Sequence, residues 1–278
     1  MNYDLTKVHE TNLKILKEID RICRKYRIQY QLDAGTLLGA VRHKGAIPWD
    51  DDADIAMTRK NYEAFVKVVK RELPPEMSFL DYRDFQGGKA FYDFTPRIIY
   101  NNSRTHEDTA EMQYYEGKLN HLWVDLFILD ELPKNGMAAS FTRMLHTVLY
   151  GLSMGHRHHL DYGKYRGVQK AAVTGLAAVG KCIPMKVLFV LQEKAAKMSN
   201  KGKSGLLYYS NYQPDYLYVT LEKEWCDHVT DLEFDGEMLM APENWHDVLT
   251  WIYGEYQKLP PKEQRVPSHS STEIQIFD

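Results

Sequence analysis

The sequence predicts an α/β fold of the α+β kind, with a mixed sheet and flanking helices followed by a largely helical C-terminal half. Up to about residue 135, segments with helical hydrophobic spacing alternate with short apolar and aromatic runs of strand length. From Met137 to Asn200 the chain is helical in character, with Gly and Pro interruptions. We therefore expect an α/β core in residues 1–135 and a helical, basic region in 136–278, joined at the loop PKNG.

In the first half, each expected element follows from the spacing of its apolar residues. Residues 5–27 carry apolar side chains at helical intervals with charges between them, which predicts an amphipathic helix. A strand is expected in IQYQLDA, and a glycine-punctuated turn and a short helix in GTLLGAVRHKG. IPWDDDADIAM predicts a loop that runs into a strand, and residues 59–73 predict a helix that ends at the two prolines after it.

The later elements are read in the same way. MSFLDY, AFYDFTPRIIY and HLWVDLFILD are short and rich in apolar and aromatic residues, which predicts further strands. Near the C-terminus, NWHDVLTWIYG predicts a helix within a polar tail that contains several prolines.

Composition limits the class of protein. Hydrophobic residues make up 44% and charged residues 26% of the 278 residues, which is typical of a folded globular chain. The net charge of −3 is too small to indicate a nucleic-acid partner. The three cysteines include no CxxC pair, which favours a reducing compartment. Because the N-terminus lacks a signal-peptide pattern and no run of about 18 apolar residues occurs, we expect a cytoplasmic protein without a spanning helix.

Basic residues gather in one segment. Residues 157–203 contain ten Lys or Arg and two acidic residues, a local charge of +8 that leaves −11 for the rest of the chain. Part of it, VQKAAVTGLAAVGKCIPMKVLFVLQEKAAK, mixes apolar with basic residues but is too interrupted to span a bilayer. Two interpretations are open: peripheral contact with an anionic membrane or a lipid-linked glycan, and a helical domain with a basic outer face.

The stretch GAIPWDDDADIAM places four carboxylates, Asp50, Asp51, Asp52 and Asp54, in five positions. Like charges repel at this spacing unless a cation neutralises them. On a strand, Asp52 and Asp54 would point to the same face, and Asp50 has the same parity. Two carboxylates on one face can hold a hard divalent cation such as Mg²⁺ (or Mn²⁺), which binds substrate phosphates at the same time.

Asp125 is the second acidic signal. It lies in the apolar run LWVDLFIL, which predicts an interior strand where a lone carboxylate would be costly unless it is paired or bound to metal. A third ligand from a neighbouring strand would explain it. The alternative is a strand-end carboxylate capped by backbone N–H groups.

Two alternatives to a metal site apply to the acidic run itself. Such a run is often a solvated loop, but the Pro-Trp before it and the alternating apolar residues after it argue against that. An EF-hand loop would require Gly where Ile55 stands and Glu where Asn61 stands, so we reject it.

The order of these motifs resembles a known superfamily. Gly35-Thr36 opens a turn at which backbone N–H groups can approach a phosphate, and the acidic pair and Asp125 follow on later strands. This resembles the nucleotidyltransferase superfamily. GTLLGAVRHKGAIPWDDDADIAM further resembles the signature of the LicD family, bacterial phosphocholine transferases whose animal relatives include the fukutin-related proteins. WVDLFILDELP and APENWHDVLTWIYGEYQKLPPKEQRVPSHS resemble two later blocks of that family, the last of which ends near His269.

The resemblance implies a nucleotidyltransferase-like core, with the C-terminal block packed on it, and a reaction. Members transfer a phospho-substituent from a CDP-linked donor such as CDP-choline to a sugar hydroxyl of a glycan precursor (teichoic acid, capsule or lipopolysaccharide), and animal relatives are thought to transfer ribitol phosphate. In this chain the metal and catalytic set would be Asp52, Asp54 and Asp125, and either Asp54 or Asp125 would take the proton of the acceptor. Donor or phosphate contacts would come from Gly35, Thr36, Arg42, Lys44, Asp50, Arg97 and His269.

Three further interpretations stay open at this point. A metal-dependent glycosyltransferase with a DxD motif would also use Asp52 and Asp54, and a ribitol- or glycerol-phosphate transferase would share the family signature. A binding subunit without activity is disfavoured by the intact acidic set. The tyrosines of 208–218 either pack in the protein interior or form an aromatic cage for choline. The segment GHRHH predicts a basic surface rather than a zinc site.

Overall fold

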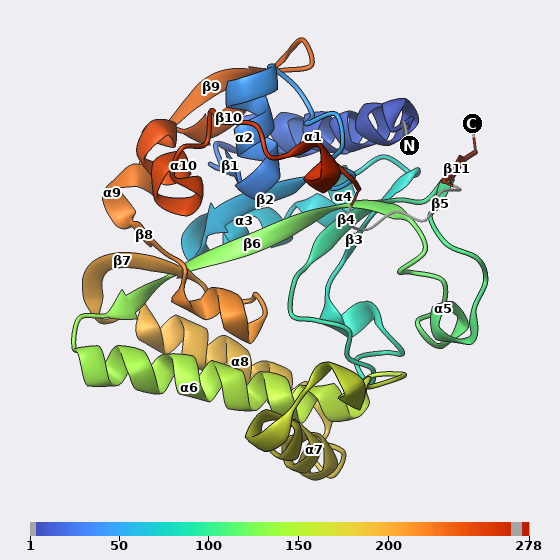
Figure 1. Cartoon of the computed structure of the whole chain (residues 1–278), viewed down its shortest axis with the longest axis vertical. Helices are drawn as coiled ribbons and strands as arrows, with labels where there is room; N and C mark the ends of the chain where they lie inside the picture. Colours follow the sequence, from blue (N-terminus) through green and yellow to red (C-terminus); the bar gives the residue numbers. More distant parts are fainter. Residues whose placement is uncertain (1–3, 268–273, 278) are drawn as a thin grey trace.

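The structure, a computed structural model, describes residues 4–267 and 274–277, and a seven-stranded sheet lies at its centre (Figure 1). Five strands follow one another in the order β1-β2-β6-β4-β3, and β7 and β8 extend the sheet from the far end of β6. β2 and β6 run parallel while the other neighbours are antiparallel, so the predicted mixed sheet is confirmed. The strands are β1 (Gln31–Leu32), β2 (Asp54–Thr58), β3 (Met77–Leu80), β4 (Arg97–Tyr100), β6 (Leu122–Pro133), β7 (Lys203–Tyr209) and β8 (Thr220–Glu222).

β6 holds the sheet together because it pairs with three strands along its length. Its first residues pair with β4, its middle with β2, and its last residues with β7. The predicted strand HLWVDLFILD is therefore confirmed. The expected strand over 28–34 shrinks to Gln31–Leu32, because only these two residues reach a partner strand, β2.

The predicted N-terminal helix is confirmed as α1 (Thr6–Tyr26), which ends where Arg27 adopts a left-handed conformation. α2 (Ala34–His43) already includes Gly35 and Thr36, so the turn predicted there before a short helix is instead the first turn of that helix. The single helix expected over 59–73 is two, α3 (Arg59–Val66) and α4 (Val69–Glu72). They separate where the N–H of Val68 bonds to the carbonyl of Phe65 three residues back rather than four.

The helical character predicted from Met137 to Asn200 corresponds to three α-helices in the structure. α6 (Gly136–Ser153), α7 (Gly167–Gly180) and α8 (Met185–Ser199) gather at one end of the molecule, away from α1 and α2 (Figure 1). We call them the helical layer. No single helix among the described residues is long and apolar enough to cross a membrane. Taken together, α7 and α8 have the length and composition of a membrane-crossing pair, but they are bent by 116° relative to each other.

After the helical layer the chain returns to the sheet. β7 and β8 join it, and a hairpin of β9 (Val229–Phe234) and β10 (Glu237–Pro242) packs beside α1 and β1. The helix predicted in NWHDVLTWIYG is confirmed as α10 (Trp245–Tyr253). Smaller elements are α5 (Ala110–Tyr114), α9 (Lys223–Cys226), and β5 (Ser103–Arg104) paired with β11 (Gln275–Ile276).

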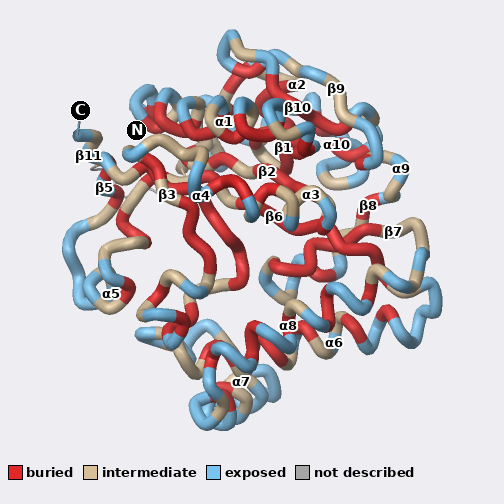
Figure 2. The backbone as a smooth tube through the Cα atoms, turned by 180° about the vertical axis from the view of Figure 1, so that it is seen from behind, coloured by how far each residue is buried: buried red, intermediate tan, exposed pale blue. Residues whose placement is uncertain are grey.

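Two hydrophobic cores result, and most of the strands are buried (Figure 2). The larger lies between α1 and the central strands, and the smaller lies between the helical layer and the loop that carries Phe91 and Phe94. A buried ion pair connects the two regions: Arg59 of α3 donates to Asp130 of β6 at 3.0 Å and to Glu193 of α8 at 2.8 Å. The division at residue 135 stays a prediction.

Candidate active site

The pairing of three strands brings two carboxylates and a guanidinium together. Asp125 on β6 lies directly opposite Asp54 on β2 and directly opposite Arg97 on β4. Residues opposite one another on adjacent strands, about 4.8 Å apart, point to the same face of the sheet. Residues more than seventy positions apart thus form one row: Asp54, Asp125, Arg97.

Arg97 is buried and is held between two carboxylates. Its Nη2 lies 3.0 Å from Asp93 Oδ2 and 3.1 Å from Asp125 Oδ1, and its guanidinium lies 5.2 Å from the ring centre of Trp123. The indole of Trp123 donates to Asp125 Oδ2 at 3.0 Å. Within the described part of the chain, Asp125 Oδ1 and Arg97 Nε are buried and make no hydrogen bond. Arg97 Nε can therefore donate to a ligand, whereas Asp125 Oδ1 already has the ion pair with Arg97 Nη2.

Charge crowding is greatest at Asp54. Burial raises the pKa of its carboxyl well above the usual range, and Asp52, Asp125, Asp33 and Asp50 raise it further. Burial likewise raises the pKa of Asp125 to about 6, although Arg97 opposes the shift. Carboxyls in this state either hold protons near neutral pH or are neutralised by a cation.

Asp33 belongs to this group and was missed by the sequence interpretation. It is buried just before α2, its N–H donates to the carbonyl of Asp54 at 3.1 Å, and its Oδ1 accepts from the hydroxyl of Tyr209 at 2.9 Å. Burial raises its pKa to about 6. The available signal was an Asp between an apolar run and Gly-Thr, where a carboxylate can precede a helix.

Gly35 and Thr36 position the acidic row. Thr36 Oγ1 accepts a hydrogen bond of 2.8 Å from the N–H of Asp54, which fixes the start of β2 against α2. A Cβ at Gly35 would collide with Asp50 Oδ2, so a side chain there would displace the carboxylate of Asp50. Asp52, expected on the strand, lies two residues before β2 and acts on the row as a neighbouring charge.

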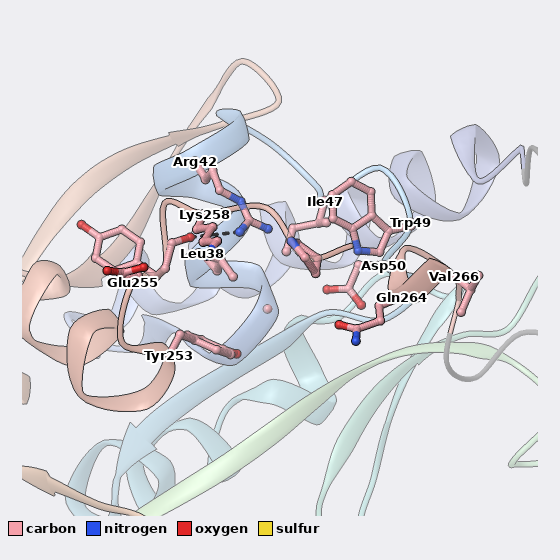
Figure 3. A pocket seen from close by; sticks show the side chains of 13 residues that line it. Leu38, Arg42, Ile47, Trp49, Asp50, Tyr253, Glu255, Lys258, Gln264 and Val266 are labelled. Atoms are coloured by element: carbon pink, nitrogen blue, oxygen red, sulfur yellow. Dashed lines mark hydrogen bonds between the residues drawn. The ribbon is translucent and has the colours of Figure 1, made fainter. Parts of the chain in front are cut away.

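A pocket of about 410 Å³ lies beside α2 (Figure 3), and Tyr253 in its wall is near enough to the row for the charges of Asp33 and Asp54 to contribute, after burial, to raising its pKa. Its walls come from α2, from the loop of residues 47–50, and from residues 253–266 of the C-terminal tail. Trp49 and Tyr253 supply aromatic surface, and Arg42 and Asp50 supply charge. Arg42 Nη1 donates to the carbonyl of Tyr256 at 3.0 Å, which joins α2 to the tail.

The remaining predicted residues lie at different distances from the pocket. Gly35, Arg42 and Asp50 line it, whereas Asp125 and Arg97 lie on the sheet face. Lys44 is exposed just after α2, in a left-handed conformation, and does not line the pocket. His269 lies outside the described residues.

The tyrosine-rich stretch is mostly packing. Tyr208 is buried against His146, and Tyr209 bonds to Asp33. Tyr212 differs: its ring stacks on Tyr216 with centroids 4.1 Å apart, and Asp54 and Asp125 contribute to raising its pKa, after burial and Tyr216. Tyr212 therefore lies close enough to the acidic row to be affected by its charge.

A divalent cation fits the chemistry of the row. All candidate ligands are oxygen donors, as Mg²⁺ or Mn²⁺ requires, and Asp125 Oδ1 is buried without a hydrogen bond in the described part of the chain. As placed, no three His, Cys, Asp or Glu side chains among the described residues converge closely enough to hold an ion. The metal set of Asp52, Asp54 and Asp125 therefore stays a prediction.

Comparison with known proteins identifies the domain that carries the acidic row. Residues 27–148 match the family model described as LicD/FKTN/FKRP, nucleotidyltransferase domain. Over 271 residues, 92% of each chain, the protein is 28% identical to lipopolysaccharide cholinephosphotransferase LicD of Haemophilus influenzae. The chain carries a LicD family domain.

A second likeness extends over a shorter part of the chain. The chain is 31% identical over 119 residues to ribitol 5-phosphate transferase FKRP of mouse and of human, a match that covers 43% of this chain and 20% of each relative. The family match runs from just before β1 into α6, so it contains the acidic row and Arg97. It does not contain residues 253–266, the C-terminal wall of the pocket.

Proposed function

We propose that this chain transfers phosphocholine, or a related phospho-substituent, from a CDP-linked donor to a sugar hydroxyl of a cell-surface glycan precursor such as lipopolysaccharide, teichoic acid or capsule. The row of Asp54, Asp125 and Arg97 carries the proposal, because attack on a pyrophosphate needs neutralised phosphoryl oxygens and an acceptor for a proton. The similarity to a lipopolysaccharide cholinephosphotransferase over nearly the whole chain supports the substituent.

Each residue has a task in this reaction. Mg²⁺ or Mn²⁺, held by Asp52, Asp54 and Asp125, would supply positive charge to the transferred phosphoryl group. Arg97, fixed by Asp93, places its guanidinium beside the same oxygens. A carboxyl of the row with a raised pKa, Asp54 or Asp125, takes the proton of the acceptor hydroxyl.

The pocket is suited to the nucleotide. Its volume of about 410 Å³ lies in the range of small-ligand sites, and it offers aromatic surface at Trp49 and Tyr253 with Arg42 beside them. The stacked rings of Tyr212 and Tyr216 offer a face for the quaternary ammonium of choline. With a nucleotide donor and a lipid-linked or glycan acceptor, we place the reaction in the cytoplasm at the inner face of the membrane.

Transfer of ribitol or glycerol phosphate is the second candidate, and the likeness to ribitol 5-phosphate transferase FKRP favours it. The two are separated by incubating the protein with Mg²⁺ and CDP-choline, CDP-ribitol or CDP-glycerol and measuring release of CMP. UDP-sugars are included, since release of UDP would instead indicate a glycosyltransferase and contradict both candidates.

Asp54→Asn tests the acidic row. We expect release of CMP to fall by at least about a hundredfold, since the substitution removes one of the carboxyls proposed to hold the cation. Asp227→Asn, at an exposed position in the second half of the chain, is the matched control and should keep its activity. Unchanged turnover in Asp54→Asn would rule out the assignment.

A further inference from the structure

The helical layer exposes an unusual amount of apolar side chain. Of the eighteen large hydrophobic residues that are exposed in the described part of the chain, ten lie between residues 134 and 200. They are Met137, Phe141, Met144, Tyr162, Val168, Val179, Val187, Val190, Leu191 and Met198. An exposed apolar surface of this kind indicates contact with another body.

On α8 these residues form one stripe. Val187, Leu191 and Met198 recur at helical spacing, and all three are exposed. The opposite side of the same helix, which includes Leu188 and Phe189, is fully buried in the smaller core. α8 is therefore apolar on two sides, and only one of them faces protein.

α6 shows the same arrangement. Met137, Phe141 and Met144 lie on the side away from the buried Thr142 and His146. α7 packs across the C-terminal half of α6, where Gly180 approaches the backbone of Leu152, and leaves most of its own surface exposed. Figure 1 shows all three helices at the end of the molecule opposite α1.

The layer is also almost without acidic residues. Over residues 136–199 the chain contains two, Asp161 and Glu193, against nine Lys or Arg, and Glu193 is paired with Arg59 and Lys197. Lys170, Lys181 and Lys194 are exposed on α7, after it and on α8, and none forms an ion pair with another described residue. The combination of exposed apolar side chains and unneutralised lysines is typical of helices that lie on anionic lipid.

We propose that the helical layer docks on an anionic lipid bilayer, with Val187, Leu191 and Met198 in the acyl boundary and Lys170, Lys181 and Lys194 at the phosphates. A second copy of the chain is a poor occupant, since two such faces would bring like charges together. α8 cannot cross a bilayer, because one of its sides is buried against the smaller protein core. The inference goes beyond the proposed reaction and does not depend on it.

Vesicle binding tests the docking directly. The full chain is sedimented with vesicles of phosphatidylcholine alone or mixed with phosphatidylglycerol, at low and high salt, without nucleotide or metal. We expect binding to the anionic vesicles only, weakened by salt. The variant Lys170→Glu, Lys181→Glu, Lys194→Glu should bind at least tenfold more weakly.

A control variant carries the same charge change elsewhere. Lys7→Glu, Lys14→Glu, Lys67→Glu changes exposed lysines outside the layer and should keep its affinity within about twofold. A third variant, Val187→Ser, Leu191→Ser, Met198→Ser, should lose at least about tenfold at fixed charge. Circular dichroism establishes that each variant is folded.

Three results would overturn the proposal. These are no binding of the wild type to anionic vesicles at low salt, an equal loss in the control variant, and self-association that the serine variant abolishes. Because the assay needs no substrate, docking can fail while release of CMP persists. Transfer can likewise fail while docking holds.

Discussion

Asp125 lies between two cross-strand neighbours, the guanidinium of Arg97 on one side and the carboxyl of Asp54 on the other. Its Oδ1 lies 3.1 Å from Arg97, while Asp54 on the other side adds negative charge. Single substitutions at these positions therefore change the charge balance of the site as well as its packing.

Arg97→Lys tests the guanidinium. A lysine ends in a single ammonium, so it offers no counterpart to the unbonded Nε of Arg97 and no planar group to lie against the ring of Trp123. We expect kcat/KM for release of CMP to fall at least about tenfold. Arg104→Lys, at an exposed position, should have no effect, and equal activity in the two variants would contradict a role for Arg97 at the phosphate.

His146 makes stability depend on pH. Burial on α6 lowers the pKa of its imidazole to about 4 from the ordinary 6.5, so the native state keeps it neutral. Between these values the unfolded chain binds a proton that the native state does not. The contribution of His146 is therefore complete above pH 6.5 and is lost as pH falls towards 4, by up to about 3 kcal/mol.

Urea unfolding of His146→Asn at pH 7.5, 6 and 5 measures this contribution. The variant should lose less stability on acidification than the wild type does. His159→Asn, at an exposed histidine, should follow the wild type. A pH dependence that is the same in all three proteins would contradict the assignment.

Among whole elements, α2 shows how context changes a local signal. Gly-Thr after a strand predicts a phosphate-binding turn, but Asp33 precedes the helix directly and Thr36 bonds to the start of β2. The helix therefore begins before the glycine. The approach of a phosphate to the backbone at Gly35 stays a prediction, and a side chain at that position would displace the carboxylate of Asp50.

Two glycines of α7 allow a matched test of how the helical layer packs. A Cβ at Gly180 would collide with the carbonyl of Leu152, so Gly180→Ala should lower the free energy of unfolding by about 1–3 kcal/mol. Nothing lies within 4 Å of a Cβ at Gly175, so Gly175→Ala should raise it by up to about 1 kcal/mol. Urea unfolding gives both values, and effects of the same sign would contradict the crossing of α7 on α6.

In the molecule as a whole, both halves of the chain contribute to one sheet. β7, from the second half, pairs with the end of β6, and residues 253–266 close the pocket against α2. The buried pair of Arg59 with Asp130 and Glu193 connects α3, β6 and α8. Neither half has its core or its pocket without the other.

We therefore expect one cooperative unfolding transition. Tryptophan fluorescence and far-UV circular dichroism should give the same midpoint in urea. A fragment of residues 1–135 should lack a cooperative transition, since it leaves one end of β6 unpaired and exposes the larger core. Two separate transitions in the full chain would instead favour independent domains.

The sequence by itself determined the mixed α/β class, α1, β6, α10 and the family signature. These depend on the local spacing of apolar residues and on contiguous motifs, which the chain carries wherever it folds. Only the tertiary structure decided that Asp54, Asp125 and Arg97 share one row, that Asp33 joins them, and that residues 253–266 close the pocket. The physical reason is that strand register and tail packing depend on contacts between distant residues, which no local spacing encodes.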